Sequence, residues 1–267
     1  MLKLATFCLV TLAATPALAA ATDWQELAPG ARARLITSDT IRNGRMLVGL
    51  ELDMPQTTNT YWRIPGETGI PTQLDFSKSI GVTDPLPRWP FPEIDTSNGY
   101  LDYVYRGPVV LPVSVQAVTG GELQLTATLG ICDTVCVPAS ATFSLALDIA
   151  KPDKANSIRL DQAVALSPIP WDQPGTPFRE IRTDVTGKVL VIDNPDRSID
   201  PATIIPDIGN PAVLFEAPQK SPDTAIWNLP LLAGADGQNL LGESIDLTFM
   251  TASGAYSFST TVGRPKP

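Results

Sequence analysis

Hydrophobic and polar residues alternate along several short segments of this 267-residue chain. Met46, Val48, Leu50 and Leu52 recur at a period of two, with Gly49 and Glu51 between the last three, and the same period recurs over residues 143–149. In an extended strand this period places one set of side chains on a buried face and the other toward water. The pattern therefore predicts an all-β fold in which antiparallel sheets pack as a sandwich.

Two longer apolar-rich segments, residues 109–118 and 122–131, flank the dipeptide Gly120-Gly121. Because a glycine pair between two strand patterns is a common signal for a tight turn, we expect a β-hairpin at this point. Residues 55–99 are rich in Pro, Gly, Thr and Asp, which indicates ordered loops with short strands between them.

The pattern changes near residue 150. Over residues 156–166 the apolar positions follow a helical period, which Pro168 and Pro170 then interrupt. Residues 171–177 are rich in turn-forming residues and have the composition of a linker. We therefore predict a short helix and a linker over residues 151–177.

Strand-like alternation resumes after the predicted linker, in shorter segments. These segments are residues 188–192, 212–215, 244–250 and 256–262. Short strands with frequent turns are typical of a small β-sandwich. The prediction is thus a first β-sandwich domain over residues 20–150 and a second, smaller β-sandwich domain over residues 178–267.

The N-terminus has the pattern of a cleavable signal peptide over residues 1–19. A basic residue precedes the apolar residues 4–14, and Ala17-Leu18-Ala19 is a small-residue cleavage motif. The apolar segment is too short to cross a bilayer as a helix, which takes about 20 residues. We expect export and cleavage near Ala19, which leaves a mature chain without a membrane span.

Composition excludes several classes of function. The chain has 19 basic and 28 acidic residues, a formal net charge of −9, and no histidine. Because nucleic-acid binding relies on clustered Lys and Arg, a nucleic-acid partner is not expected. Without histidine the chain has no imidazole metal ligand, no Ser-His-Asp triad and no Cys-His pair. We expect no cofactor and no metal.

Two cysteines remain after signal cleavage removes Cys8, an even number in a compartment that permits disulfides. Four residues of extended strand span about 13 Å, whereas a disulfide needs Cα atoms within about 7 Å. If Cys132 and Cys136 pair, the chain must therefore turn through Asp133 and Thr134, both acceptable turn residues. The pair would then lie at a loop tip that another protein can reach.

Such a pair has three possible purposes. A bridge that closes five residues stabilises a fold by only about 2 kcal/mol in the loop-closure account, so we favour a redox role over a structural one. A structural disulfide in a non-catalytic exported binding module is the main alternative. A third alternative is copper handling, because two thiolates could hold Cu(I), although no histidine is present to complete a copper site.

The local charges predict a passive role for the two sulfurs. Residues 107–150 contain no Lys or Arg, and the carboxylate of Asp133 lies between the cysteines, which disfavours a thiolate. The disulfide is then better suited to attack by a partner's activated cysteine, through a mixed disulfide. We therefore expect an electron relay and not an independent catalyst, and we expect a Cys136→Ser variant to trap the partner through Cys132.

The segment Cys132-x-x-x-Cys136-Val137-Pro138 resembles the redox loop of a known family, the N-terminal periplasmic domains of the thiol:disulfide interchange protein DsbD, in its ScsB-like branch. Further motifs of that branch occur upstream in one order. They are Thr60-Tyr61-Trp62-Arg63, Pro65-Gly66, Gly69-Ile70-Pro71, Trp89-Pro90-x-Pro92, Gly99-Tyr100 and Val110-Leu111-Pro112-Val113.

The resemblance implies an immunoglobulin-like sandwich in the periplasm, with Cys132 and Cys136 as a redox pair. It also implies that the domain takes electrons from a membrane-embedded donor, here acting in trans, and passes them to periplasmic thiol-disulfide proteins. Members of the family shield the pair with an aromatic-bearing loop, for which Tyr61, Trp62 and Trp89 are the candidates. The best-known DsbD proteins have a longer cysteine spacing than this chain.

Overall fold

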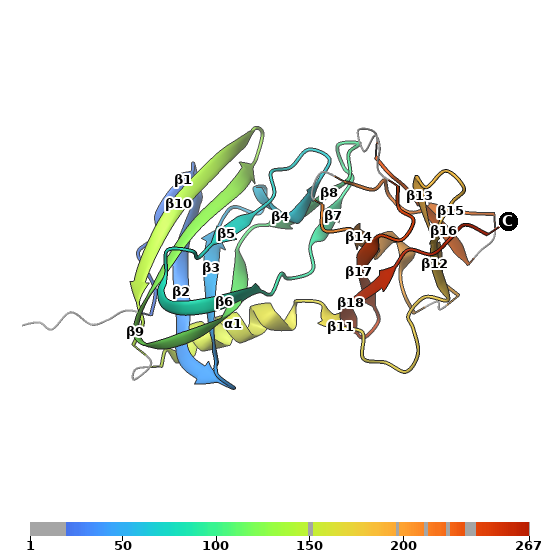
Figure 1. Ribbon diagram of the computed structural model, residues 1–267. Helices are drawn as coiled ribbons and strands as arrows, with labels where there is room; N and C mark the ends of the chain where they lie inside the picture. The colour runs from blue at the N-terminus through green and yellow to red at the C-terminus, as the bar shows by residue number, and fades with distance from the viewer. Residues whose placement is uncertain are drawn as a thin grey trace, which may run out of the picture.

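The computed structural model describes residues 20–148, 152–195, 198–210, 213–222, 225–232 and 239–266. The predicted signal peptide, residues 1–19, lies outside the described residues, as does the start of the predicted strand 212–215. A ten-stranded sheet occupies one end of the molecule and two four-stranded sheets occupy the other (Figure 1). The prediction of an all-β fold is confirmed.

The larger sheet is antiparallel and contains the first ten strands. They are β1 (Gln25–Ala28), β2 (Ala31–Arg42), β3 (Arg45–Asp53), β4 (Asn59–Gly66), β5 (Gln73–Asp75), β6 (Ile80–Pro87), β7 (Glu93–Asp95), β8 (Asp102–Arg106), β9 (Val109–Cys132) and β10 (Cys136–Ala146). The path β1-β2-β3-β9-β4-β8-β7 is continuous, and β5, β6 and β10 each pair with β9. This sheet curls around one hydrophobic core as an immunoglobulin-like sandwich.

The alternation read from the sequence matches the buried face of β3. Met46, Val48, Leu50 and Leu52 are each at most 1% exposed, and all four belong to the first core. Leu50 is paired with Leu35 of β2 on one side and Leu111 of β9 on the other. Burial of these side chains, at about 25 cal/mol per Å² of apolar surface, is the main force that closes the sandwich.

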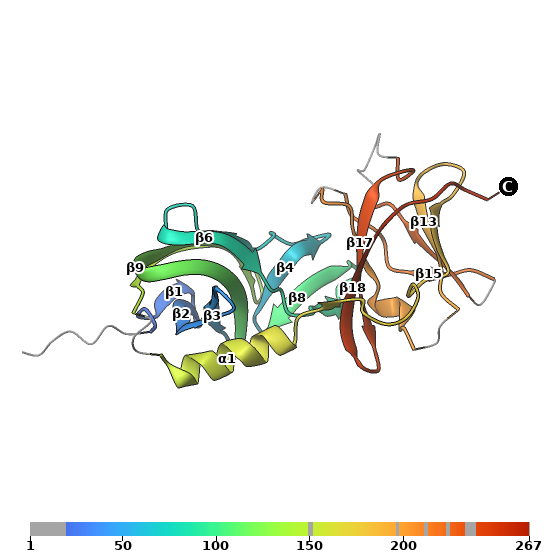
Figure 2. The same cartoon turned by 60° about the horizontal axis from the view of Figure 1, so that its bottom comes forward.

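The predicted hairpin at Gly120-Gly121 is wrong, because the chain continues there as the single strand β9. The part of β9 before the glycines pairs with β3, and the part after them pairs with β10. Gly120 has a φ of +75°, which an L side chain rarely adopts. The glycines therefore let the strand curve around the core, as Figure 2 shows, and do not reverse its direction.

The predicted helix is present as α1 (Lys154–Ala165). Asp153 caps its N-terminus by accepting a hydrogen bond from the Asn156 N–H at 2.8 Å. Leu160 is fully buried on the helix face that packs against β3, where Gly49 leaves space for it. Among the described residues no helix has the length and apolar character needed to cross a membrane.

The C-terminal part contains two four-stranded sheets around a second hydrophobic core. One sheet consists of β11 (Ile169–Pro170), β14 (Ile205–Asp207), β17 (Ser244–Thr251) and β18 (Gly254–Thr261), and the other of β12 (Glu180–Thr183), β13 (Val189–Asp193), β15 (Gln219–Lys220) and β16 (Ile226–Pro230). A 3-10 turn, Pro201–Thr203, precedes β14. Two sheets that share one core form the smaller sandwich predicted from the sequence.

The predicted linker packs against this second core. Trp171 contacts the rings of Phe249 and Tyr256, with centroids 5.9 Å and 5.1 Å away. An ion pair between Arg63 and Asp207 joins the two parts of the molecule. The exact limits given above for the two domains, residues 20–150 and 178–267, stay a prediction.

A buried carboxyl group in β2 predicts a pH dependence of stability. Asp39 is 3% exposed, and burial raises its pKa from 3.8 to about 6, with a contribution from the charges of Asp148 and Asp153. A raised pKa in the folded state means that ionisation of Asp39 weakens the fold as the pH rises from about 4 to above 6. We expect Asp39→Asn to increase the free energy of unfolding at pH 7.5 by about 1 to 3 kcal/mol.

The gain should disappear as the pH falls to about 4, because the wild-type carboxyl is then neutral. Urea unfolding of both proteins between pH 7.5 and pH 4 measures this difference, with Asp172→Asn as an exposed control. Asn is compatible with the φ of +47° at this position. A difference between Asp39→Asn and wild type that does not change with pH would contradict the assignment.

Candidate redox site

The two cysteines lie opposite each other at the end of the β9–β10 hairpin. Cys132 is the last residue of β9, Cys136 is the first of β10, and the two are paired in the antiparallel register. Their Cα atoms are 4.0 Å apart and their sulfurs form a disulfide. The chain reverses through Asp133, Thr134 and Val135, so the predicted turn between the cysteines is confirmed.

The two sulfur-bearing residues differ in their exposure. Cys132 is 4% exposed, whereas Cys136 is an exposed residue. Two apolar side chains accompany Cys136 on the surface: Val135 is 71% exposed and Val137 is 38% exposed. A thiolate from another protein can therefore approach the Cys136 side of the bridge, while the fold covers the Cys132 side.

Tyr61 contacts both sulfurs from the neighbouring strand β4. Its hydroxyl oxygen lies 3.2 Å from the Cys132 Sγ and 3.4 Å from the Cys136 Sγ. Neither sulfur of a disulfide carries a proton, so the tyrosine hydroxyl is the donor. The contact depends on the pairing of β4 with the end of β9, in which Asn59 is the partner of Cys132.

The Tyr61 ring lies in a space that exists because two neighbouring residues, Gly69 and Gly130, have no side chain. A Cβ atom added to Gly69 would lie 2.2 Å from the ring, and one added to Gly130 would lie 3.1 Å from it. The Thr72 hydroxyl donates a hydrogen bond to the Tyr61 carbonyl oxygen, which fixes the backbone at the same point. Tyr61 is 3% exposed, so its hydroxyl is presented to the sulfurs in a fixed position.

Of the three aromatic residues considered for shielding the pair, only Tyr61 touches it. Trp62 is buried in the first core, where its ring meets that of Tyr103 edge-on at 6.1 Å. Trp89 is partly buried against the same core. Tyr61 also reaches the sulfurs from within a strand, and not from a covering loop.

The arginines of the adjacent strands are already occupied by acidic partners. Arg63 pairs with Asp207 and lies 4.5 Å from the centre of the Trp62 ring. Arg106, the neighbour of Asn59 in β8, pairs with Glu93 and Asp95. Within the described ranges, no ion pair or hydrogen bond joins a cation to either sulfur.

Metal ligands do not gather at this site. In the part of the chain that the structure describes, no group of three or more Cys, His, Asp or Glu residues is placed to hold a metal ion. The chemistry that the geometry supports is the opening and closing of one disulfide, with the tyrosine hydroxyl as a hydrogen-bond donor.

The fold and the site together define a class of domain. It is an immunoglobulin-like sandwich that carries a disulfide at the tip of a hairpin. Residues 26–148 match the family described as the N-terminal domain of the thiol:disulfide interchange protein DsbD. The matched part of the chain contains both cysteines.

One solved structure is similar over almost its whole length. It is the N-terminal periplasmic domain of ScsB from Proteus mirabilis, with a TM-score of 0.71 and 21% sequence identity, and the match covers 91% of this chain and 98% of that one. At this identity the likeness establishes the fold. A second comparison, with the human desmocollin-1 ectodomain, has a TM-score of 0.22 and 10% identity and covers 83% of this chain and 44% of that one. No curated protein matches the chain.

Proposed function

We propose that this protein is a periplasmic thiol-disulfide exchange domain, in which Cys132 and Cys136 cycle between disulfide and dithiol. One observation carries the proposal: the bridge has one exposed sulfur-bearing residue, Cys136, and one buried residue, Cys132, which receives a hydrogen bond from Tyr61. The match of residues 26–148 to the DsbD N-terminal family supports the exchange chemistry and the periplasmic location.

The exposure of the cysteines gives an order to the exchange. A partner thiolate attacks the Cys136 Sγ, a mixed disulfide forms there, and the bond between the two cysteines breaks. The electron pair of that bond goes to the Cys132 Sγ, which leaves as a thiolate within reach of the Tyr61 hydroxyl. A second thiolate of the partner then attacks the partner sulfur that is bonded to Cys136, which forms the partner's disulfide and releases Cys136 as a thiolate.

The balance of this sequence is two electrons and two protons. The partner dithiol becomes a disulfide, and this domain becomes the dithiol after its two thiolates take up protons. The reverse sequence, which starts with the Cys136 thiolate, reduces an acceptor. We propose a membrane protein acting in trans as the electron donor and periplasmic thiol-disulfide proteins as the acceptors.

A purely structural role explains the site less well. The β9–β10 ladder is continuous from the Cys136–Cys132 pair to the Ala146–Glu122 pair, so hydrogen bonds already hold the hairpin that the disulfide closes. A bridge across such a short loop adds little constraint to the unfolded chain. A buried tyrosine hydroxyl aimed at both sulfurs also has no evident purpose in a clip that never opens.

The exposure of the cysteines reverses the trapping experiment expected from the sequence. We expect Cys132→Ser to form a stable mixed disulfide through Cys136, because the resolving sulfur is then missing. Cys136→Ser should form little adduct, since the remaining Cys132 is buried. Incubation with periplasmic extract, followed by non-reducing electrophoresis and mass spectrometry of the adduct, measures both. Equal trapping by the two variants, or none by either, would contradict the proposed order.

Removal of the tyrosine hydroxyl should slow the opening of the bridge. A hydrogen bond to a charged sulfur contributes about 1.5 to 3 kcal/mol, so we expect Tyr61→Phe to reduce the rate of reduction by dithiothreitol about tenfold or more. Tyr100→Phe, at a tyrosine that is 53% exposed, is the matched control and should leave the rate unchanged. An unchanged rate in Tyr61→Phe would show that the contact takes no part in the exchange.

A further inference from the structure

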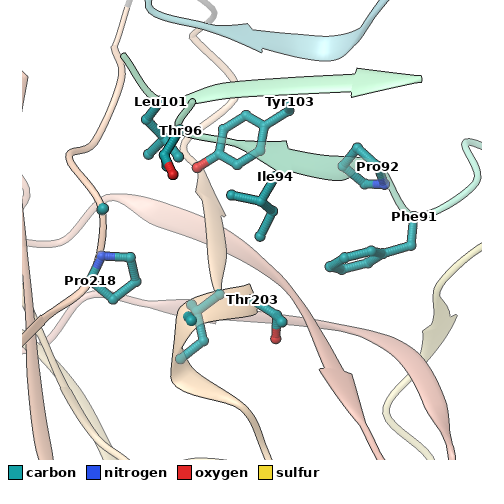
Figure 3. Close-up of a pocket in the computed structure, with 11 residues that line it drawn as sticks. Phe91, Pro92, Ile94, Thr96, Leu101, Tyr103, Thr203 and Pro218 are labelled. Atoms are coloured by element: carbon teal, nitrogen blue, oxygen red, sulfur yellow. The ribbon is translucent and has the colours of Figure 1, made fainter. Parts of the chain in front are cut away.

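A cavity of about 440 Å³ lies between the two parts of the molecule. One wall comes from residues 91–103, which include β7 and β8 of the first sheet, and the other from residues 202–204 and 217–218 of the C-terminal part (Figure 3). Its volume lies within the range of about 300 to 1,000 Å³ that is typical of small-molecule sites. Such sites often occur where two domains meet.

The floor of this cavity is apolar. Pro92, Leu101 and Ile204 are buried, and Phe91 and Ile94 are partly buried beside them. Exposed residues, among them Thr96 and the small side chains of Ala202 and Ala217, form the mouth. An apolar compound that enters would therefore bury the part of its surface that faces this floor, which favours binding.

Tyr103 supplies a hydrogen-bond donor that has no protein partner in the described part of the chain. The residue is 6% exposed and its ring is fixed edge-on against Trp62, yet no described residue hydrogen-bonds its hydroxyl. The adjacent Tyr105, in contrast, donates to the Pro90 carbonyl oxygen at 2.7 Å. In Figure 3 the Tyr103 hydroxyl points away from its own strand, toward the side of the cavity where Thr96 and Leu101 lie.

The Thr203 hydroxyl, which also lines the cavity, is already used. The Thr203 hydroxyl donates to the Asp200 carbonyl oxygen at 2.6 Å and accepts from the Met250 N–H at 2.9 Å. Burial raises the pKa of Tyr103 well above its usual value, so its hydroxyl remains a neutral donor at physiological pH. A ligand that accepts one hydrogen bond here would pair with a hydroxyl that has no protein partner in the described part of the chain.

We propose that this cavity binds a small apolar molecule that carries one hydrogen-bond acceptor, such as a ketone or ether oxygen, directed at the Tyr103 hydroxyl. A peptide is less suitable, because each of its buried amides would need a partner and the floor is apolar. The site is separate from the disulfide and does not rest on the proposed exchange reaction.

A matched pair of probes tests the proposal with the full-length protein. Benzophenone has a ketone oxygen, and diphenylmethane has nearly the same shape without it. Titrations are followed by NMR through the methyl groups of Ile94, Leu101 and Ile204. We expect both compounds to shift these signals, and benzophenone to bind about threefold to tenfold more tightly, as one net hydrogen bond allows.

Two variants separate the hydroxyl from the cavity. Tyr103→Phe should remove the preference for benzophenone and leave diphenylmethane binding unchanged. Ala217→Phe places a large side chain in the mouth and should abolish binding of both probes. Ala155→Phe is a control at an exposed alanine in the first turn of α1, outside the cavity lining, and should bind both as wild type does.

Three results would overturn the proposal. The first is that neither probe shifts the three methyl signals at its limit of solubility. The second is that the two probes bind equally and Tyr103→Phe changes nothing, which would make the cavity merely apolar. The third is that neither probe binds while Ala217→Phe weakens the association with a thiol-disulfide protein, which would assign this surface to a protein partner.

Discussion

The register of the β9–β10 ladder sets the position of the disulfide, and most of the site depends on it. Cys132 and Cys136 are opposite each other because Phe143 and Leu145, farther along the same ladder, face the first core. A shift of the ladder by one residue would turn these two side chains toward water, and Cys132 and Cys136 would no longer be opposite each other. The burial of apolar side chains that take no part in the chemistry thus fixes the two sulfurs in place.

The pairing of β4 with the end of β9 adds the second feature of the site, the difference between the sulfurs. It covers Cys132 and brings the Tyr61 hydroxyl to both sulfurs, while Cys136 stays on the outer side. A disulfide that is open to attack on one side and hydrogen-bonded on the other is suited to directional exchange. Val104 of β8 adds to the cover over Cys132, in one buried cluster with Tyr61.

Local patterns in the sequence predicted the elements whose conformation is decided locally. The alternation over residues 46–52 gave β3, the helical period and its prolines gave α1, and the four-residue spacing of the cysteines required the turn that is present. The hairpin predicted at residues 120–121 is absent, because glycines permit both a reversal and a bend. The choice between them is made by β3, β6 and β10, which pair with the two halves of β9.

The features that escaped prediction join residues far apart in the chain. Tyr61 was one of three candidate aromatic residues, and only the pairing of β4 with β9 shows that it, and not Trp62, reaches the sulfurs. The greater exposure of Cys136 has the same origin. The cavity beside Tyr103 combines two domains, so no single segment of the sequence could indicate it.

The reduction potential of the Cys132–Cys136 pair is the most direct test of the central claim. Equilibration in glutathione buffers of defined ratio, followed by alkylation of free thiols and mass spectrometry, gives its value. A bridge that opens and closes in exchange with other proteins should have a potential above about −300 mV, in the range of catalytic couples from roughly −270 to −120 mV. A potential below about −300 mV would mean that the disulfide is a permanent structural link, and would contradict the account.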